Sequence, residues 1–579
     1  MICKKGQKEK SMTELWRVYL YDLCPRVVFL IVFTLLFNPA GAQPWSKKAA
    51  QAVFTLKTFG PDGSLLGSSN GFFVGENGEA LSSFTPFKGA SRAVVIDAQG
   101  KEWPVEYLMG ANDMYDVAKF MVTVKKPTTL TLAASAANGT TAWMLPYTVK
   151  KAPECIQGTV SSSESFQGNY AYYTLAMQVP EQHAGSPVLN DNGEVLGLLQ
   201  PAANGAAATT SYAVSATFAN DLRISGLSLN DPALRSTNIA KALPDQLDEA
   251  LLTIYMAATV MDQAQYEELL NRFIQKFPNA ADGYIYRARI AVAKGDFAAA
   301  NADMKQALSV GGKTDDTHYQ FAQMIYQKEV YQHDQPFSEW NLDLALEESR
   351  KANSLNPQPV YLKQQAQILY VQKKYDESFK LFEQLTQTPL RDADIFYSAA
   401  QCKLQLGERE QMLALLDSAV NTFTKPYIKT AAPYLLARAN ALFDAGKYRP
   451  AVNDYNDYEA LMASQLTAEF YYQREQAEMA GHLYKQALED IVRATEMAPA
   501  EPIFFAEKAN VELRVGKTDE AIATAQQSIR IAPDNSDGYL ILGLAQCLKG
   551  QKEEGLKNLN KAKELGNSQA QTLIDKYSN

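Results

Sequence analysis

The feature that most constrains this 579-residue chain is a repeat of 34 residues in its C-terminal part. Residues of like size recur one period apart, as in the pairs Phe505 and Tyr539, Ala509 and Gly543, Gly516 and Gly550, and Ala521 and Gly555. Between them the apolar residues follow helical spacing. A short helix pair cannot bury its apolar face alone, so a series of such pairs has to stack each pair on the next. The period therefore predicts an all-α solenoid.

These blocks resemble tetratricopeptide repeats (TPRs), in which small residues let two antiparallel helices pack closely and a proline ends the second helix. The fullest match begins at Glu501 and ends at residues 531–534. Earlier repeats begin near Thr467, Ala432, Ala393, Gln358, Asp316 and Ala280, with a further pair over about 245–278. The sequence thus predicts about eight helix pairs over residues 245–579, and an insertion near 331–340 that forms a loop between two helices.

The TPR resemblance implies a concave face, lined by the first helices, that binds a protein or peptide partner. The ninth repeat position, which the family places on that face, holds six amides: Gln323, Gln367, Gln401, Asn440, Gln476 and Asn510. An amide donates and accepts hydrogen bonds, which suits a peptide backbone. Tyr397 and Tyr472 at the fifth position are candidates for aromatic contacts. Asn is also common at the ninth position in the family generally, so a structural role for these amides stays open.

The N-terminal part, residues 43–230, has a different pattern. Short runs rich in β-branched and aromatic residues, such as residues 53–56, 71–74 and 93–96, alternate with Gly-rich, Asn-rich and Asp-rich turns, and no long helical pattern interrupts them. Many short strands at close spacing predict an all-β barrel or sandwich. Residues 231–244 then read as a linker before the helical region.

One loop in this part resembles the Gly-Asp-Ser-Gly-Gly-Pro loop that carries the nucleophile in trypsin-like serine proteases, including the Deg-type enzymes. Aligned on Gly185 and Pro187, the chain has Gln182 at the first glycine, His183 at the acidic position, Ala184 at the nucleophile and Ser186 at the last glycine. An alanine methyl group cannot attack a carbonyl carbon, because acyl transfer needs a hydroxyl with an adjacent base. A side chain at position 182 also puts the oxyanion hole in doubt.

The resemblance extends over nearly the whole N-terminal part and implies a trypsin-like double barrel. Residues 69–87 look like the hairpin that leads into the family's histidine loop, with Thr85 at the histidine position. Residues 113–122 look like the segment that carries the triad aspartate, with Asp116 at that position. The resemblance therefore implies that only the third triad member is retained. Asp116 is then expected to be a hydrogen-bonded carboxylate in the cleft or at the surface.

The scarcity of histidine in this part of the chain gives a second argument against catalysis by a Ser-His-Asp triad. His183 is the only histidine between residues 43 and 317, so no other imidazole of this part could act as a general base. An alternative left open is a hydrolase with displaced groups, using Ser186 or Ser83 with His183. No second His, Cys or carboxylate stands near His183 in the sequence, and no metal site or cofactor is predicted.

The first 42 residues read as a secretory signal peptide. Arg17 and Arg26 precede an apolar run over 27–37, and the small residues Ala40 and Ala42 follow it, so cleavage after Ala42 is predicted, with Met1 or Met12 as the start. The run is too short to span a bilayer, although a signal anchor stays an alternative. The chain is thus expected to be exported, periplasmic or extracellular, with no integral membrane segment after cleavage.

Net charge and cysteine spacing bear on the kinds of partner and site that the chain can have. The net charge is -9, and without the basic N-terminal segment the chain is more acidic still. Such a chain is a poor electrostatic match for nucleic acid. Cys155, Cys402 and Cys547 are too widely spaced to suggest a disulfide framework or a zinc site. We therefore expect an exported pseudoprotease joined to a TPR solenoid that binds a protein or peptide. The alternatives are an active hydrolase with displaced residues and a TPR binding protein whose β-domain is only structural.

Overall fold

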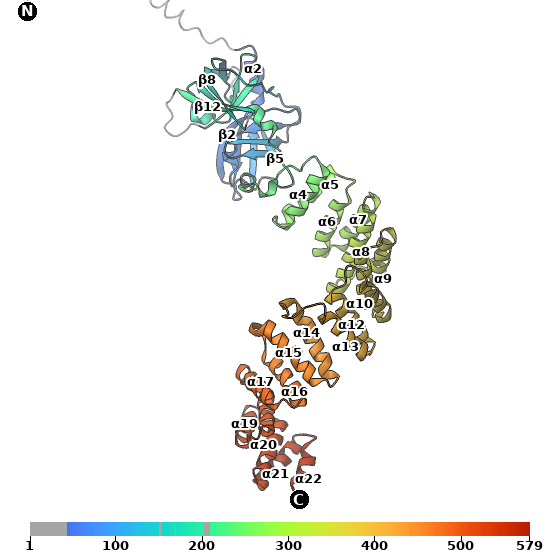
Figure 1. Ribbon diagram of the computed structural model, residues 1–579. Helices are drawn as coiled ribbons and strands as arrows, with labels where there is room; N and C mark the ends of the chain where they lie inside the picture. Colours follow the sequence, from blue (N-terminus) through green and yellow to red (C-terminus); the bar gives the residue numbers. More distant parts are fainter. Residues whose placement is uncertain (1–42, 150–152, 168, 202–208, 579) are drawn as a thin grey trace, which may run out of the picture. The chain divides into compact units, whose positions relative to one another are not determined.

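The computed structural model describes residues 43–149, 153–167, 169–201 and 209–578 (Figure 1). The predicted signal peptide lies outside the described residues. The chain divides into two compact units, with the boundary between Gly283 and Tyr284. We describe each unit by itself.

The N-terminal unit contains two closed antiparallel barrels of six strands each. The first barrel has the strand order β1-β2-β3-β6-β5-β4 and the second the order β10-β11-β12-β9-β8-β7. The strands of the first barrel are β1 (Val53–Phe59), β2 (Leu65–Phe73), β3 (Glu79–Ser82), β4 (Arg92–Ile96), β5 (Glu102–Asn112) and β6 (Val117–Val122). Those of the second are β7 (Thr141–Met144), β8 (Ile156–Phe166), β9 (Tyr170–Ala176), β10 (Pro187–Leu189), β11 (Val195–Leu199) and β12 (Thr210–Ser215). The predicted all-β double barrel is confirmed.

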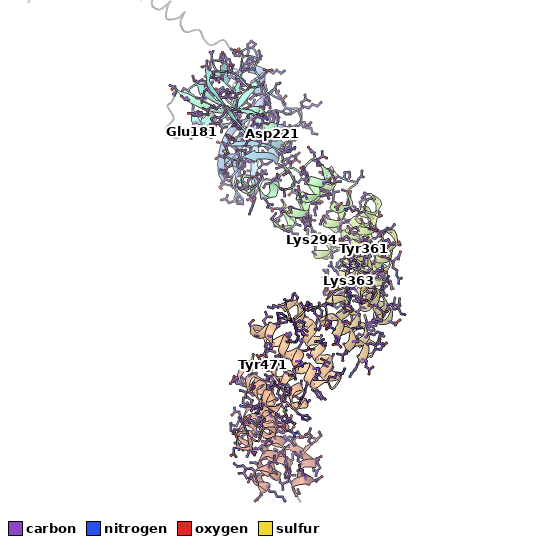
Figure 2. The ribbon with its side chains drawn as sticks, viewed as in Figure 1. Glu181, Asp221, Lys294, Tyr361, Lys363 and Tyr471 are labelled. Carbon is purple, nitrogen blue, oxygen red and sulfur yellow. The ribbon has the colours of Figure 1, made fainter. Side chains whose placement is uncertain are left out.

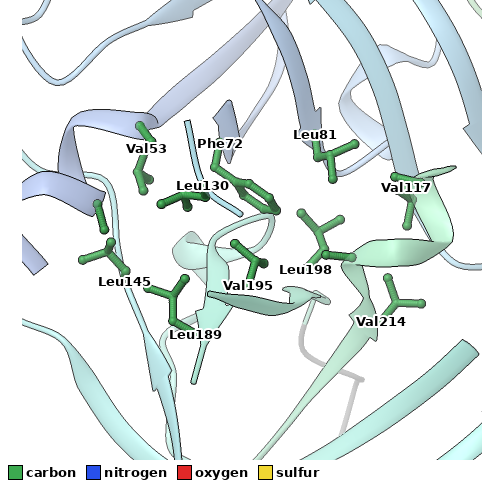
Figure 3. Close-up of a cluster of buried hydrophobic side chains, with 14 of the residues drawn as sticks. Val53, Phe72, Leu81, Val117, Leu130, Leu145, Leu189, Val195, Leu198 and Val214 are labelled. Atoms are coloured by element: carbon green, nitrogen blue, oxygen red, sulfur yellow. The ribbon is translucent and has the colours of Figure 1, made fainter. Parts of the chain in front are cut away.

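Three apolar clusters hold this unit together. One fills the first barrel around Phe54 and Phe120, and another fills the second barrel around Tyr173 and Leu175. The third joins the two barrels. It packs Phe72 of β2 and the neighbouring strands of the first barrel against Leu198 of β11 and its neighbours (Figure 3). Burying each such side chain contributes about 1.5–3 kcal/mol, so this cluster stabilises the contact between the two barrels.

The chain leaves the second barrel at the end of β12 and then returns to the first barrel. After the single-turn helix α3 (Pro232–Arg235) it runs beside β5, where Leu108 N–H donates to Ala240 O at 2.8 Å and Ala242 N–H donates to Leu108 O at 2.7 Å. The helices α4 (Leu247–Ala257) and α5 (Gln263–Lys276) follow. The segment predicted as a linker is therefore bonded to the barrel over its middle part.

Helix α6 (Ala281–Ala293) crosses the unit boundary, and the C-terminal unit continues as helix pairs. Its helices are α7 (Phe297–Ser309), α8 (Thr314–Tyr331), α9 (Leu342–Leu355), α10 (Pro359–Val371), α11 (Tyr375–Leu385), α12 (Ala393–Gln405), α13 (Arg409–Val420), α14 (Ala432–Asp444), α15 (Tyr448–Met462), α16 (Ala468–Ala480), α17 (Tyr484–Met497), α18 (Pro502–Arg514), α19 (Thr518–Ile531), α20 (Ser536–Leu548), α21 (Lys552–Glu564) and α22 (Ala570–Ser578). The predicted all-α region of TPR-like pairs is confirmed. The expected loop lies between α8 and α9.

The turn inside seven of the described helix pairs uses a left-handed residue. In five of the pairs this residue is a glycine with φ between +71° and +87°, namely Gly295, Gly407, Gly446, Gly516 and Gly550. A residue with a Cβ atom is strained in this conformation. Lys373 and His482 nevertheless adopt it at the same point of their pairs, with φ of 61° and 58°.

The position just before the ninth repeat residue faces the second helix of its pair: at Gly543 an added Cβ atom would lie 2.7 Å from Gly555 O. It is buried, and in the described repeats it holds small residues with one exception: Ala322, Ala366, Ala400, Ala439, Ala509 and Gly543. The exception is Glu475 of α16, which is also buried, at 0% exposure. A carboxyl group thus occupies a place that the other repeats fill with at most a methyl group.

Two further observations apply only to the part of the chain that the structure describes. In that part, no helix is both long enough and apolar enough to cross a membrane. Nor does it contain a group of three or more His, Cys, Asp and Glu side chains placed to hold a metal ion. Cys155, Cys402 and Cys547 are free thiols.

Candidate functional site

The loop that resembles the nucleophile loop lies between β9 and β10 and begins with the 3-10 turn η3 (Glu181–His183). Ala184 N–H donates to Glu181 O at 3.1 Å, and Ser186 N–H donates to His183 O at 3.0 Å. In a trypsin-like site the N–H of the nucleophile residue helps to bind the oxyanion. Here that N–H is already bonded to the carbonyl of Glu181, whose side chain Figure 2 labels on the double barrel.

Strand β2 holds this loop in place through Asn70. Its backbone N–H donates to Ala184 O at 2.9 Å, and its side-chain Nδ2 donates to Ser186 Oγ at 3.0 Å. Gly185 has φ of +82°, and a Cβ atom there would collide with the Asn70 carbonyl oxygen. Sequence reasoning assigned Asn70 no role. The available signal was the amide between Ser69 and Gly71, directly before the apolar run of residues 72–74.

Thr85 and Asp116 lie together, in the arrangement that the resemblance implies for the base and the orienting carboxylate. Asp116 is 8% exposed and has φ of 48°. Its Oδ1 accepts a hydrogen bond from Thr85 N–H at 2.6 Å. Its Oδ2 is buried and has no hydrogen-bond partner among the described residues. A histidine at residue 85 could donate a ring N–H to such an oxygen, as the triad requires.

The alternative nucleophiles are placed differently. Ser186 is fully buried, and its hydroxyl oxygen accepts from the Asn70 amide, which cannot remove a proton from it. Ser83 is also buried, and its hydroxyl has no partner among the described residues. Burial lowers the pKa of His183. The described contacts thus pair neither serine hydroxyl with an imidazole.

In the helical unit, most of the predicted peptide-binding amides bond to neighbouring side chains. Gln364 Nε2 donates to Gln323 Oε1 at 3.2 Å. Asn440 Oδ1 accepts from Tyr455 Oη at 2.6 Å and from Gln473 Nε2 at 2.8 Å. These contacts cross from one helix to the next and give the amides a role in packing, which was the open structural alternative.

Three of the predicted residues line one cavity. Gln367 of α10 with Tyr397 and Gln401 of α12 surround a space of about 160 Å³, together with Tyr326 and Tyr370. No charged side chain belongs to its lining. The cavity has the size of one apolar or aromatic side chain, with amide groups at its wall.

The remaining predicted residues lie beside carboxyl groups. Gln476 Nε2 donates to Glu475 Oε2 at 2.7 Å, and Asn510 Nδ2 donates to Glu507 Oε1 at 2.9 Å. Burial raises the pKa of Glu475 to about 9, with a further contribution from the charge of Glu507. The Oε1 atom of Glu475 has no hydrogen-bond partner among the described residues. Tyr472 packs on Phe504 with ring centroids 5.1 Å apart.

Several cations of this unit are ion-paired. Lys363 Nζ lies 3.4 Å from Asp394 Oδ2, and the nearby Tyr361 hydroxyl donates to Asp315 Oδ2 at 2.9 Å (Figure 2). Arg474 of α16 donates to both oxygens of Asp490, at 2.6 and 2.9 Å. Such bidentate pairs are among the strongest contacts that a side chain makes.

Comparison with known proteins matches parts of the chain. Residues 69–198 match the family model of the trypsin-like peptidase domain. A curated relative, the TPR repeat-containing thioredoxin TDX of Arabidopsis thaliana, is 32% identical over 82 residues, which is 14% of this chain. The chain spans only 22% of the length of that relative.

Two solved structures are similar to the chain at low identity. The Rv3671c protease of M. tuberculosis in its active form is 20% identical, covering 32% of this chain and 85% of its own, with a TM-score of 0.28. The HtrA-type protease AlgW with a decapeptide is 18% identical, covering 30% of this chain and 63% of its own, with a TM-score of 0.26. The two barrels and the family match together identify the N-terminal domain. The chain therefore joins a trypsin-like peptidase domain to a long region of TPR-like helix pairs.

Proposed function

We propose that this protein is an exported pseudoprotease with a TPR solenoid, and that it binds a protein or peptide without cleaving it. The observation that carries the proposal is the state of the triad positions. Asp116 keeps its contact to the backbone of residue 85, but its Oδ2 has no partner among the described residues, and the nucleophile position holds Ala184. A hydroxyl and a base are both required for acyl transfer.

The loop geometry supports the same conclusion. The Ala184 N–H, which would serve an oxyanion hole, is bonded to Glu181 O within the loop. Binding such an oxyanion would first require that bond to break. Rate enhancement by the remaining donors would then be small.

For the binding role, the support comes from the cavity lined by Gln367, Tyr397 and Gln401. On this proposal an extended segment of the partner inserts one neutral side chain there, and the two amides bond to its backbone. Export rests on the N-terminal signal sequence alone. The TPR relative supports a protein partner only by analogy of its repeats.

Hydrolysis assays test the first half of the proposal. The purified protein should cleave neither casein nor small ester substrates at a rate above buffer. An inhibitor-sensitive activity that is lost in Ser186→Ala or His183→Ala would overturn it in favour of a hydrolase with displaced groups.

Peptide binding tests the second half. A library of extended nonapeptides should yield binders whose affinity falls at least tenfold in the Gln367→Ala, Gln401→Ala double variant. The matched control is Gln411→Ala, because Gln411 of α13 is exposed and lies outside the cavity lining. If the peptides bind the double variant as tightly as the unmutated protein, the binding site lies elsewhere. If binding also required residues 43–230, the β-domain would be more than structural.

A further inference from the structure

A second cavity lies within the N-terminal unit, away from the protease-like cleft. It has a volume of about 330 Å³ and is enclosed by residues 224–242, by helix α4 and the turn that follows it, and by helix α5. Its apolar lining includes Leu234, Val260, Met261 and Leu269. A space of this size accommodates a small organic molecule.

Positive charge dominates the polar part of this lining. Arg235, Lys241 and Arg272 line the cavity, against a single carboxylate, Glu268. No carboxylate of the described residues lies within ion-pair distance of Lys241 Nζ or of the Arg272 guanidinium group. Partly buried cations without a counter-ion are uncommon, because desolvation disfavours the charged form.

The two cations are held in position by backbone carbonyl groups. Lys241 Nζ donates to Thr237 O at 2.6 Å, and Arg272 Nη1 donates to Lys241 O at 3.0 Å. Lys241 keeps two further N–H donors, and Arg272 Nε is buried without a hydrogen-bond partner among the described residues. Donors from both side chains are therefore available in one enclosed, partly apolar space.

Burial also affects the protonation of these groups. It lowers the pKa of Lys241 to about 8 and that of Arg272 below its usual range. For Arg272 the charges of Glu268 and Glu106 oppose the effect of burial only in part. An anion in the cavity would supply the missing counter-charge.

We propose that this cavity binds a small organic carboxylate, whose oxygens accept from Lys241 Nζ and Arg272 Nε and whose apolar tail contacts the aliphatic lining. The site is independent of the peptide-binding role proposed above. It would join the segment beside β5 to helix α5 through one ligand, since each element contributes one of the two cations.

The probe for the test is hexanoate, with inorganic phosphate as the comparison, titrated calorimetrically into the full-length protein. Hexanoate should bind saturably, and more tightly than phosphate, because phosphate has no apolar part. The Lys241→Met variant should bind hexanoate at least tenfold more weakly. The matched control is Lys276→Met, because Lys276 lies on the same helix as Arg272, is ion-paired with Asp245 and does not line the cavity.

A pH series on the unmutated protein gives a second readout that needs no variant. The carboxylate favours the ammonium form of Lys241, so hexanoate affinity should fall as the pH rises above about 8. The other charged groups that line the cavity are Arg235, Glu268 and Arg272. The proposal is wrong if hexanoate does not saturate, if phosphate binds more tightly, if Lys241→Met leaves its affinity unchanged, or if affinity is flat between pH 7 and 10.

Discussion

The β-domain and the helical region each contain a buried carboxyl group with one oxygen that has no hydrogen-bond partner among the described residues, but for opposite reasons. At Asp116 the surroundings are those of a triad, and the residue that would use the oxygen is replaced by Thr85. At Glu475 the surroundings are those of a close helix contact, where the other described repeats have Ala or Gly. The Asp116 oxygen lacks the donor that a triad histidine would supply. The Glu475 oxygen belongs to a carboxyl group that the helix contact does not require. The changes that should raise stability are therefore opposite. A donor should be added beside Asp116, and the carboxyl group should be removed at residue 475.

A third buried carboxyl group, Asp490, gives the fully partnered reference for this comparison. Arg474 is 4% exposed and donates to both of its oxygens. The Arg474→Met variant should lower the free energy of unfolding of the helical region by about 3–5 kcal/mol, because the buried Asp490 loses both hydrogen bonds from Arg474 and keeps only the 4.0 Å contact with Arg493. Urea unfolding followed by circular dichroism measures this. A loss below about 1 kcal/mol would mean that Asp490 finds other partners.

Removing the carboxyl group at residue 475 should have the opposite sign. The Glu475→Met variant, of similar length but apolar, is expected to raise the free energy of unfolding by about 1–3 kcal/mol, because an unsatisfied buried polar atom is eliminated. Glu489→Met on the exposed face of α17 is the matched control and should change little. If Glu475→Met instead destabilises the region, the carboxyl group makes a contact that favours the fold.

The buried carboxyl group of Glu475 also predicts that the stability of the helical region depends on pH. Burial raises the pKa of Glu475 to about 9 and that of Glu478 to about 8, whereas both carboxyls titrate near 4.5 when unfolded. Between these values the folded state holds more protons than the unfolded state, so stability falls as the pH rises from about 5 to about 9. Chemical unfolding at pH 5, 7 and 9 should show this decline. The decline should be shallower in Glu475→Gln, and an equal slope would assign it to other groups.

A hydrogen-bond donor added at residue 85 tests the β-domain half of the comparison, the buried carboxyl group of Asp116. In Thr85→His, an imidazole N–H that bonds to Asp116 Oδ2 should raise the pKa of the new histidine above 6.5 and stabilise the domain by about 1 kcal/mol. The ring pKa is measured by NMR titration. An unshifted value would show that the oxygen is out of reach of residue 85.

The smallest expected effect concerns backbone strain with no polar group involved. Lys373 occupies the left-handed turn position that glycine occupies in five other pairs. Lys373→Gly should raise stability by about 0.5 kcal/mol, because relief of the strained conformation outweighs the greater freedom of the unfolded chain. Calorimetric melting measures the change. A fall in melting temperature would mean that the lysine side chain stabilises the turn.

The sequence was sufficient for the fold because both of its signals are periodic. Small residues every 34 positions predicted the helix pairs, and alternating strands with turn residues predicted the barrels. The trypsin-like pattern also placed Thr85 and Asp116 at two positions of one catalytic triad, which implied that they lie close together. The part that stayed hidden depends on contacts between residues far apart in the chain.

Asn70 and the Lys241 cavity illustrate that limit. Asn70 acts on a loop 112–116 residues later, and no local pattern marks that contact. Lys241 and Arg272 line one space only because residues 237–242 fold back beside β5. The carboxyl group of Glu475 was visible as a departure from the repeat, but only its burial reveals what the departure costs.

The bonds between residues 236–242 and the first barrel also determine how the chain bears tension. Gly89 N–H donates to Ser236 O at 2.7 Å and Asn238 N–H donates to Ala90 O at 2.8 Å, in addition to the two bonds with Leu108. A pull on the polypeptide beyond residue 243 would load these four bonds before it reached β12. Such tension would thus act on β5 and on residues 89–90 of the first barrel before it reached the second barrel.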